Sequence, residues 1–288
     1  MGKYKIIVDT GADMPEEMAR KYDIDIIRFM SVFGEESYVT GTELNNEQFY
    51  EKLKSYDGIP TTAQTPYADF YEILKKASLE NDTVIYFAIS STASGQYNTA
   101  CMIRNEILEN DNPNANIRIF DTMKFSAYIT GVAIYAKELL DGGMSVDEVL
   151  VKCREYIDSW EVYILVDTLK YLEKGGRITK TSAIVGSLLD IKPVLTIRNG
   201  LIEPVEKIRG RKKLYKKLID LIRENPKFDE NANEFMIVES NKDYANEMLE
   251  LLKKEFGIED VKYNLEFGPV IGTHIGPGTL AVLFRVKK

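Results

Sequence analysis

The stretch TVIYFAISSTASGQYNTACMIRNEIL, residues 83–108, decides the fold of the first half of this chain. A continuous apolar run leads through a turn of small hydroxyl-bearing residues and glycine into an amphipathic segment. This order is typical of a buried strand followed by a helix. It recurs in KYKIIVD before PEEMARKY and in NIRIFDT before KFSAYITGVAIYAKELL. The sequence therefore predicts an α/β domain over residues 1–160, whose parallel sheet is covered by helices on both faces.

The pattern changes after residue 160. Alternating strand-like residues in KPVLTIRNGLIEPVEKI flank Asn199 and Gly200, and this pair predicts a tight hairpin with a type I′ turn. Two helix-like stretches follow, RKKLYKKLIDLIREN and KDYANEMLELLKKEF, interleaved with the strand-like segments EFMIVES, VKYNLEF and TLAVLFRV. We therefore expect residues 161–288 to form a second, α+β domain with a mixed or antiparallel sheet.

The composition argues against several classes of protein. The net charge of −8 is unlike that of a nucleic-acid-binding protein, which needs clustered excess Lys and Arg. The apolar runs are far shorter than the ~20 residues that span a bilayer, and the N-terminus has a strand pattern without a signal-peptide core, so we expect a cytoplasmic protein. Cys101, Cys153 and the single histidine are too few for a zinc site, so no metal is expected and both cysteines are predicted to be core residues.

Three turns between a strand and a helix are dense in glycine or hydroxyl-bearing residues: DTGADM at 9–14, TTAQTP at 61–66 and ISSTASGQY at 89–97. Because parallel sheets bind ligands at the carboxyl ends of their strands, we expect the three turns to converge on one crevice. Ser94 and Gly95 begin a predicted helix, whose unpaired N–H groups could receive a carboxylate or a phosphate. In an isolated turn the hydroxyls would more often only cap the helix, but three such turns favour an anion site.

The only histidine, His274, lies between two Gly-Pro pairs in EFGPVIGTHIGPGT, residues 266–279, and we expect these pairs to hold it in a rigid loop. Together with Ser94 and an aspartate it would form the triad of a serine hydrolase or acyl transferase. However, Thr92 and Gln96 stand where a nucleophile elbow would place glycines. The sequence also lacks a phosphate-binding P-loop and a Gly-x-Gly-x-x-Gly motif after its first strand. We therefore expect a binding protein without catalytic residues, and the hydrolase remains the alternative.

Seven ordered motifs between residue 6 and about residue 284 resemble those of the DegV family. VDTGADM is similar to that family's Asp-Ser-Thr-Ala-Asp-Leu turn, and TTAQTPYADF to its Thr-Ser-Gln-Pro segment. ISSTASGQYNTA resembles Ser-Ser-x-x-Ser-Gly-x-Tyr-x-x-Ala, and DTLKYLEKGGRI resembles Asp-Thr-Leu-x-Tyr-Leu-x-x-Gly-Gly-Arg-Ile. The segments IKPVL, KIRGRKK and GPVIGTHIGPGT follow in the family's order.

The resemblance implies a two-domain fold and a function, because members of the family bind a single fatty acid and serve as the lipid-carrying subunit of bacterial fatty acid kinase. It further implies that the carboxyl head group meets the hydroxyls of Thr62 and Ser94, the backbone of Gly95, and His274. The sequence departs from the family pattern at three positions: Gly11, Ala63 and Thr65. We therefore expect the first turn to be looser than in the family.

Binding a long acyl chain in competition with a membrane requires an enclosed site. A tail of about sixteen carbons gains ~0.8 kcal/mol per buried methylene, on the order of 12 kcal/mol before ordering costs, and a bilayer offers the tail much the same. The chain must therefore be enclosed nearly completely, and we expect a tunnel between the two domains. The segment TSAIVGSLLDIKPVL is the candidate wall, and an ordinary core helix is the alternative. Its proposed tunnel residues are Ile184, Val185, Leu188 and Leu189.

The basic run KIRGRKKLYKKL, residues 207–218, stands out in an acidic chain. A solvated helix face and a docking surface are both consistent with so short a run. The resemblance favours docking to a kinase and implies contacts by Arg177 and Arg209, with transient contact to anionic lipid as a second possibility. The sequence has neither an ATP loop nor an acidic metal cluster, so we expect no cofactor and catalysis by a separate kinase.

Overall fold

The computed structural model describes residues 2–179, 191–209 and 213–287. The chain divides into two compact units, and each is described by itself. Unit 1 comprises Met1–Ile157 with Gly268–Ile271, and unit 2 comprises Asp158–Phe267 with Gly272–Lys288. The sequence-based domain boundary at residue 160 lies three residues after Ile157, where the first segment of unit 1 ends. In contrast, Gly268–Ile271, which was expected in the second domain, belongs to unit 1.

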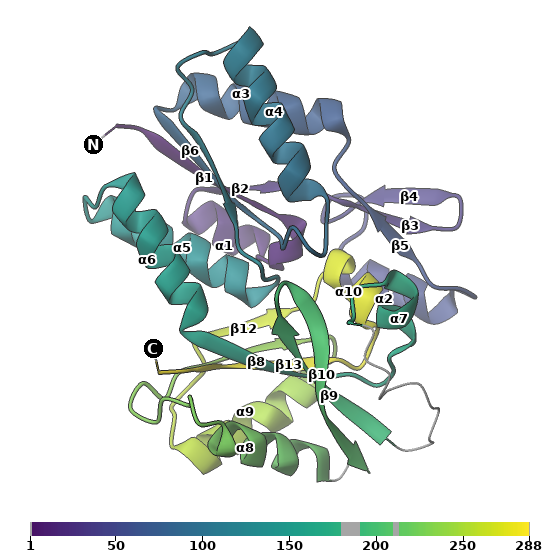
Figure 1. The fold of residues 1–288 in the computed structure, drawn as a ribbon. Helices are drawn as coiled ribbons and strands as arrows, with labels where there is room; N and C mark the ends of the chain where they lie inside the picture. Colours follow the sequence, from purple (N-terminus) through teal and green to yellow (C-terminus); the bar gives the residue numbers. More distant parts are fainter. Residues whose placement is uncertain (1, 180–190, 210–212, 288) are drawn as a thin grey trace. The chain divides into compact units, whose positions relative to one another are not determined.

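Unit 1 is built on a four-stranded sheet in the order β2-β1-β6-β7 (Figure 1). All three strand pairs are parallel, which confirms the predicted α/β architecture. The apolar residues of β6 are fully buried along its whole length, as expected for a central strand with helices on both faces. The strands are β1 (Tyr4–Asp9), β2 (Ile24–Ile27), β6 (Thr83–Ala88) and β7 (Ile117–Asp121).

Helices cover both faces of this sheet. On one face, Phe70 and Leu74 of α3 and Ile103 of α4 pack with Ile7 and Tyr86 of the central strands. Helix α5 packs on β1 and β6 and is buried over much of its length, while α1 packs on β2. The helices of unit 1 are α1 (Glu16–Lys21), α2 (Asn46–Ser55), α3 (Tyr67–Glu80), α4 (Gln96–Asn110), α5 (Ala127–Asp141) and α6 (Val146–Asp158), with a 3-10 turn, η1, at Thr10–Ala12.

A second, smaller sheet in unit 1 was not foreseen from the sequence. It is antiparallel in the order β4-β3-β5 and consists of β3 (Met30–Phe33), β4 (Glu36–Val39) and β5 (Thr61–Ala63). Phe33 packs against Phe49 of α2, so this sheet has its own apolar contact. The three residues of β5 are polar or small and only partly covered, and a strand this short has no readable hydrophobic period.

Unit 2 contains a six-stranded sheet in the order β10-β9-β8-β13-β11-β12. Among the described strands of this sheet, only β11 and β12 pair in parallel, so of the two predicted kinds, mixed or antiparallel, the sheet is mixed. The predicted hairpin joins β9 and β10, and both turn residues have positive φ, 50° for Asn199 and 78° for Gly200, as a type I′ turn requires. The strands are β8 (Trp160–Leu165), β9 (Ile191–Arg198), β10 (Leu201–Arg209), β11 (Phe235–Glu239), β12 (Tyr263–Glu266) and β13 (Leu280–Arg285).

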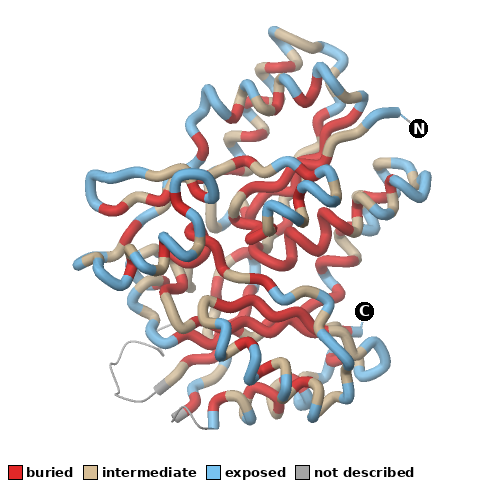
Figure 2. The backbone as a smooth tube through the Cα atoms, turned by 180° about the vertical axis from the view of Figure 1, so that it is seen from behind, coloured by how far each residue is buried: buried red, intermediate tan, exposed pale blue. Residues whose placement is uncertain are grey.

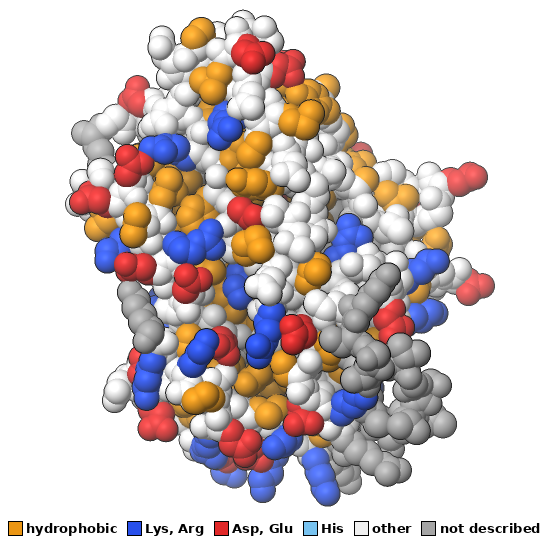
Figure 3. All heavy atoms as spheres, viewed as in Figure 1, with side chains coloured by type: hydrophobic (Ala, Val, Ile, Leu, Met, Phe, Trp, Pro, Cys, Tyr) orange, Lys and Arg blue, Asp and Glu red, His pale blue; other side chains and the backbone are white. Residues whose placement is uncertain are grey.

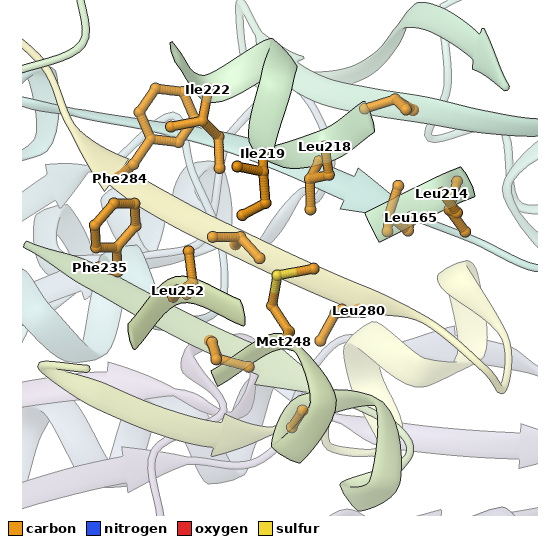
Figure 4. Packing of buried hydrophobic residues seen from close by; sticks show 14 of the residues in the cluster. Leu165, Leu214, Leu218, Ile219, Ile222, Phe235, Met248, Leu252, Leu280 and Phe284 are labelled. Carbon is orange, nitrogen blue, oxygen red and sulfur yellow. The ribbon is translucent and has the colours of Figure 1, made fainter. Parts of the chain in front are cut away.

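The core of unit 2 lies between this sheet and two helices, α8 (Leu214–Glu224) and α9 (Lys242–Phe256). Leu218 and Ile222 of α8 lie over the sheet near Phe284, and Met248 of α9 lies over the same face (Figure 4). Within each unit, the buried backbone follows the strands and the exposed backbone follows the loops and outer helix faces (Figure 2). The described residues also form two short helices, α7 (Lys170–Gly175) and α10 (Pro269–Ile275).

Candidate functional site

The first turn follows β1 and is organised by Asp9, whose side chain is fully buried. Its carboxylate caps η1 by accepting a hydrogen bond from the Gly11 N–H at 2.9 Å. It also accepts bonds from the Ile89 N–H at 2.9 Å and from the Tyr86 hydroxyl at 2.6 Å. Because Ile89 begins the third turn, Asp9 ties the first and third turns together.

The second turn, residues 61–66, does not lie at the edge of the parallel sheet where the sequence predicted it. Residues 61–63 form the antiparallel strand β5, so this turn does not follow a strand of the parallel sheet. Thr62 is partly buried and pairs with Ser31 across the small sheet. Thr65 donates to the Arg28 carbonyl at 2.8 Å and accepts a bond from Gln96 Nε2 at 3.2 Å. Side-chain hydrogen bonds, rather than a shared sheet edge, therefore connect this turn to the start of α4.

The third turn ends at Ser94 and Gly95, immediately before α4 as predicted. The Ser94 N–H donates to the Ser90 carbonyl at 3.0 Å, and the Ser94 hydroxyl accepts from the Gln96 N–H at 3.3 Å. Ser94 therefore makes one weak local contact of the capping kind, and its O–H remains available as a donor. Gly95 is exposed, and a Cβ there would lie 2.7 Å from Gln64 Nε2. The missing side chain therefore lets Gln64 pack closely against the start of α4, while the Gly95 backbone remains exposed.

In unit 2, His274 lies in the last turn of α10. The flanking Gly-Pro pairs had suggested a rigid loop, and that expectation was wrong. The end of this helix packs closely on the segment around α7. A Cβ on Gly175 would lie 2.5 Å from His274 Nδ1, and one on Gly276 would lie 2.4 Å from the Tyr171 ring. The glycines of the KGGR and HIGPG segments thus allow the two segments of unit 2 to approach each other.

His274 is uncharged at neutral pH. Burial, with a further contribution from the positive charge of Arg177, lowers the pKa of His274 from its ordinary 6.5 to about 4. A neutral imidazole offers one N–H donor and one acceptor nitrogen. His274 can therefore donate a hydrogen bond to a carboxyl group without forming an ion pair with it, as expected for a head group held by uncharged donors.

The structure brings some of the predicted site residues together and leaves others apart. Ser94 and Gly95 are adjacent in unit 1, and Gln64, Thr65 and Gln96 link their turn to that of Thr62. His274, Arg177 and Arg209 belong to unit 2. The proposed tunnel residues lie outside the described residues: Ile184, Val185, Leu188 and Leu189.

Sequence reasoning missed three buried polar residues behind these turns: Asp9, Tyr86 and Gln96. Two of them carried a signal. Asp9 ends an otherwise apolar strand, and Gln96 directly follows Ser94 and Gly95 at the predicted start of a helix. Tyr86 lies inside an apolar run and carried no signal.

Neither a metal cluster nor a membrane-spanning helix is found within residues 2–179, 191–209 and 213–287. Among these residues, no three His, Cys, Asp or Glu side chains are grouped so that they could hold a metal ion. Within the same part of the chain, no helix is both long enough and apolar enough to cross a bilayer.

The fold and the three turns define a mixed α/β protein with a parallel-sheet unit that presents uncharged donors and a second, sheet-rich unit. A family model named DegV, described as "Uncharacterised protein, DegV family", matches residues 3–287. The chain belongs to the DegV family.

Relatives with known structures or names extend this finding. The chain is 32% identical to Protein DegV of Bacillus subtilis over 284 residues, covering 98% of this chain and 99% of the relative. It is 34% identical to a fatty acid-binding protein of Thermotoga maritima, with 96% of both chains covered. The crystal structure of a fatty acid-binding DegV family protein from Streptococcus agalactiae matches with a TM-score of 0.85 at 30% identity, covering all of both chains.

Proposed function

We propose that this protein binds one long-chain fatty acid. In this proposal the carboxyl group is held by the hydroxyls of Thr62 and Ser94, by the backbone of Gly95, and by His274. The acyl tail is enclosed in an apolar tunnel. The observation that carries the proposal is the exposed start of α4 at Ser94 and Gly95, which has no side-chain cap and occurs in a chain whose relatives include fatty acid-binding proteins.

The physical argument for a carboxyl ligand rests on the kind of donors present. Hydroxyl and amide groups at a helix start stabilise a carboxylate through hydrogen bonds and through the partial positive charge of the helix end. His274 adds an uncharged donor, because its pKa of about 4 keeps the imidazole neutral. A carboxylate held by such donors keeps lone pairs free for further chemistry, whereas a permanent bidentate ion pair with arginine would occupy them.

Native mass spectrometry of the protein purified from its expression host tests this proposal. We expect a discrete mass addition equal to one fatty acid, lost on denaturation and restored by adding oleate. An enclosed apolar site should favour retention through purification, because release of the tail exposes it to water. Delipidated protein that acquires no mass from oleate would contradict the proposal.

We further propose that the bound fatty acid is presented to a separate kinase, which phosphorylates its carboxyl group. The candidate docking residues are Arg177 and Arg209 in unit 2. Arg177 is partly exposed and donates to the Gly175 carbonyl, so its position is defined by the KGGR segment. Basic and acidic side chains are mixed over the visible face of the molecule (Figure 3), so charge reversal at one position is a specific test of docking.

Charge reversal in Arg209→Glu is expected to lower acyl phosphate formation by the kinase catalytic subunit and ATP about tenfold or more, because a repulsive charge then faces the partner. Oleate affinity should change little. Lys254→Glu, on the exposed side of α9, is the matched control and should retain kinase coupling. Equal loss of coupling and of oleate binding in Arg209→Glu would show that the residue acts on the lipid site instead.

The hydrolase alternative has less support. A general base is most effective when its pKa lies near the working pH, and that of His274 is about 4. Labelling of Ser94 by a fluorophosphonate probe, together with ester turnover, would favour the enzyme over the carrier.

A further inference from the structure

Asp9 is a buried carboxyl group whose side-chain hydrogen bonds join two of the turns that form the candidate head-group site. Its side chain has no exposed surface. One oxygen accepts from the Gly11 N–H, and the other accepts from the Ile89 N–H and the Tyr86 hydroxyl. Asp9 therefore contacts the first turn, the third turn and the central strand β6 at once.

The hydrogen bonds continue from Tyr86 to the other turns. The Gln96 side chain hydrogen-bonds the Tyr86 hydroxyl, and its Nε2 donates to Thr65 Oγ1 at 3.2 Å. The Gln96 N–H donates to the Ser94 hydroxyl at 3.3 Å. Tyr86 and Gln96 are both fully buried. A continuous buried chain thus runs from Asp9 to Ser94 in the third turn and to Thr65 in the second.

One atom of this chain has no partner in the ionised arrangement. Gln96 Oε1 is buried and, within the described part of the protein, accepts no hydrogen bond. A buried acceptor without a donor is unfavourable, and such atoms are rare in folded proteins. The carboxamide is therefore held with its nitrogen toward Tyr86 and Thr65 even though its oxygen remains unsatisfied.

We propose that Asp9 is the positioning residue of the head-group site, and that only its ionised form holds Gln96, Ser94 and Thr65 in the arrangement that binds a carboxylate. This inference deepens the proposed fatty-acid function and rests on it. Asp9 itself does not touch the ligand and acts through Tyr86 and Gln96.

Protonation of Asp9 changes which groups donate hydrogen bonds to Tyr86 and Gln96, as a count of the donors shows. Ionised Asp9 can only accept, so Tyr86 donates to it and Gln96 Nε2 supplies the donor toward Tyr86. Protonated Asp9 becomes a donor to the Tyr86 oxygen, and Tyr86 must then donate elsewhere. The available acceptor is Gln96 Oε1, which reaches Tyr86 only if the carboxamide turns over. Turning it removes the Nε2 bond to Thr65, whose own hydroxyl already donates to the Arg28 carbonyl.

Asp9 changes its protonation state within a pH range in which ligand binding can be measured. Burial raises the pKa of Asp9 from 3.8 to about 6, although its three hydrogen bonds oppose the rise. The neighbouring elements carry other ionisable groups, and each of these has its own contact. Tyr86 on β6 donates to Asp9 itself, and Asp13, after η1, accepts from the Gly268 N–H. Arg28, after β2, forms an ion pair with Glu16. Lys124, before α5, lies over the ring of Tyr128.

Ligand affinity measured from about pH 5 to about pH 8 tests the inference. Hexadecanesulfonate is the probe, because its head group stays charged throughout, and oleate is the reference ligand. For the wild type, we expect sulfonate affinity to fall about fivefold or more as the pH drops through the pKa of Asp9. In Asp9→Asn, which cannot ionise, affinity should be low and independent of pH. A flat profile for the wild type, or the wild-type profile in Asp9→Asn, would overturn the inference.

Tyr86→Phe decides the question if Asp9→Asn does not fold. This change keeps the ring in the core and removes one hydrogen bond that stabilises the carboxylate, so the midpoint of the profile should move to higher pH. Tyr4→Phe is the matched control, because Tyr4 also donates to an aspartate, Asp141, but at the opposite end of β1. An unshifted midpoint in Tyr86→Phe contradicts the role of Asp9. Failure of the wild type to bind oleate at any pH would instead contradict the proposed function.

Discussion

Replacing Thr62 and Ser94 together with alanine is expected to weaken oleate binding about a thousandfold. Each hydroxyl donates to a carboxylate in the proposed site, and a hydrogen bond to a charged group contributes roughly 1.5–3 kcal/mol, so each single change should weaken binding about ten- to a hundredfold. Both side chains are only partly buried, so their removal should leave the fold intact. Isothermal titration of delipidated protein with oleate measures the effect.

Thr92→Ala is the control for this experiment. Thr92 lies in the same turn as Ser94, is exposed, and directs its hydroxyl toward the sulfur of Met123 at 4.0 Å. Its loss should change oleate affinity by less than about threefold. If the double variant binds as tightly as the wild type, the carboxyl group must be held elsewhere, and the assignment of the third turn is wrong.

Gly276→Ala is expected to destabilise unit 2 by about 2–5 kcal/mol. Gly276 has a φ of +75°, and a side chain in this region costs about 1–2 kcal/mol. The added Cβ would also lie 2.4 Å from the Tyr171 ring, and overpacking of this kind costs about 1–3 kcal/mol. The single tryptophan, Trp160, is buried in unit 2, so its fluorescence during urea unfolding reports on this unit.

Gly257→Ala separates the cost of a side chain at positive φ from the cost of overpacking against the Tyr171 ring. Gly257 also lies in unit 2 and has a φ of +69°, but a Cβ there would meet no atom within 4 Å. It should therefore lose only about 1–2 kcal/mol. Equal destabilisation by the two variants would mean that the Tyr171 ring moves aside without cost. A larger loss in Gly276→Ala should be accompanied by weaker oleate binding, because the residue follows the helix that carries His274.

The regular parts of the fold were predictable because their signals are local. The apolar run of β6 and the Asn199–Gly200 turn each have one favoured conformation, set by burial on both faces or by positive φ. The small sheet was not predictable, because β5 contains only three residues and its pairing with β3 depends on chain far away in sequence. The expectation that all three turns follow strands of one parallel sheet was wrong for the same reason.

The candidate site also combines features that the sequence predicted with features that it could not predict. The hydroxyl-rich turn before α4 and the placement of Ser94 and Gly95 at a helix start could be predicted from residue type and spacing. The position of His274 in a helix could not be predicted, because the flanking Gly-Pro pairs are equally compatible with a rigid loop. The low pKa of His274 depends on its burial and on the proximity of Arg177, and the sequence shows neither.

By itself, the sequence determined the alternation of strands and helices, the hairpin of unit 2, and the family to which the chain belongs, since these depend on local conformational preferences and on ordered motifs. Only the tertiary structure decided that Asp9, Tyr86 and Gln96 form a buried chain joining three turns that are far apart in sequence. The physical reason is that hydrogen bonding and desolvation depend on which groups meet in the folded core, and residue spacing along the chain does not specify those meetings.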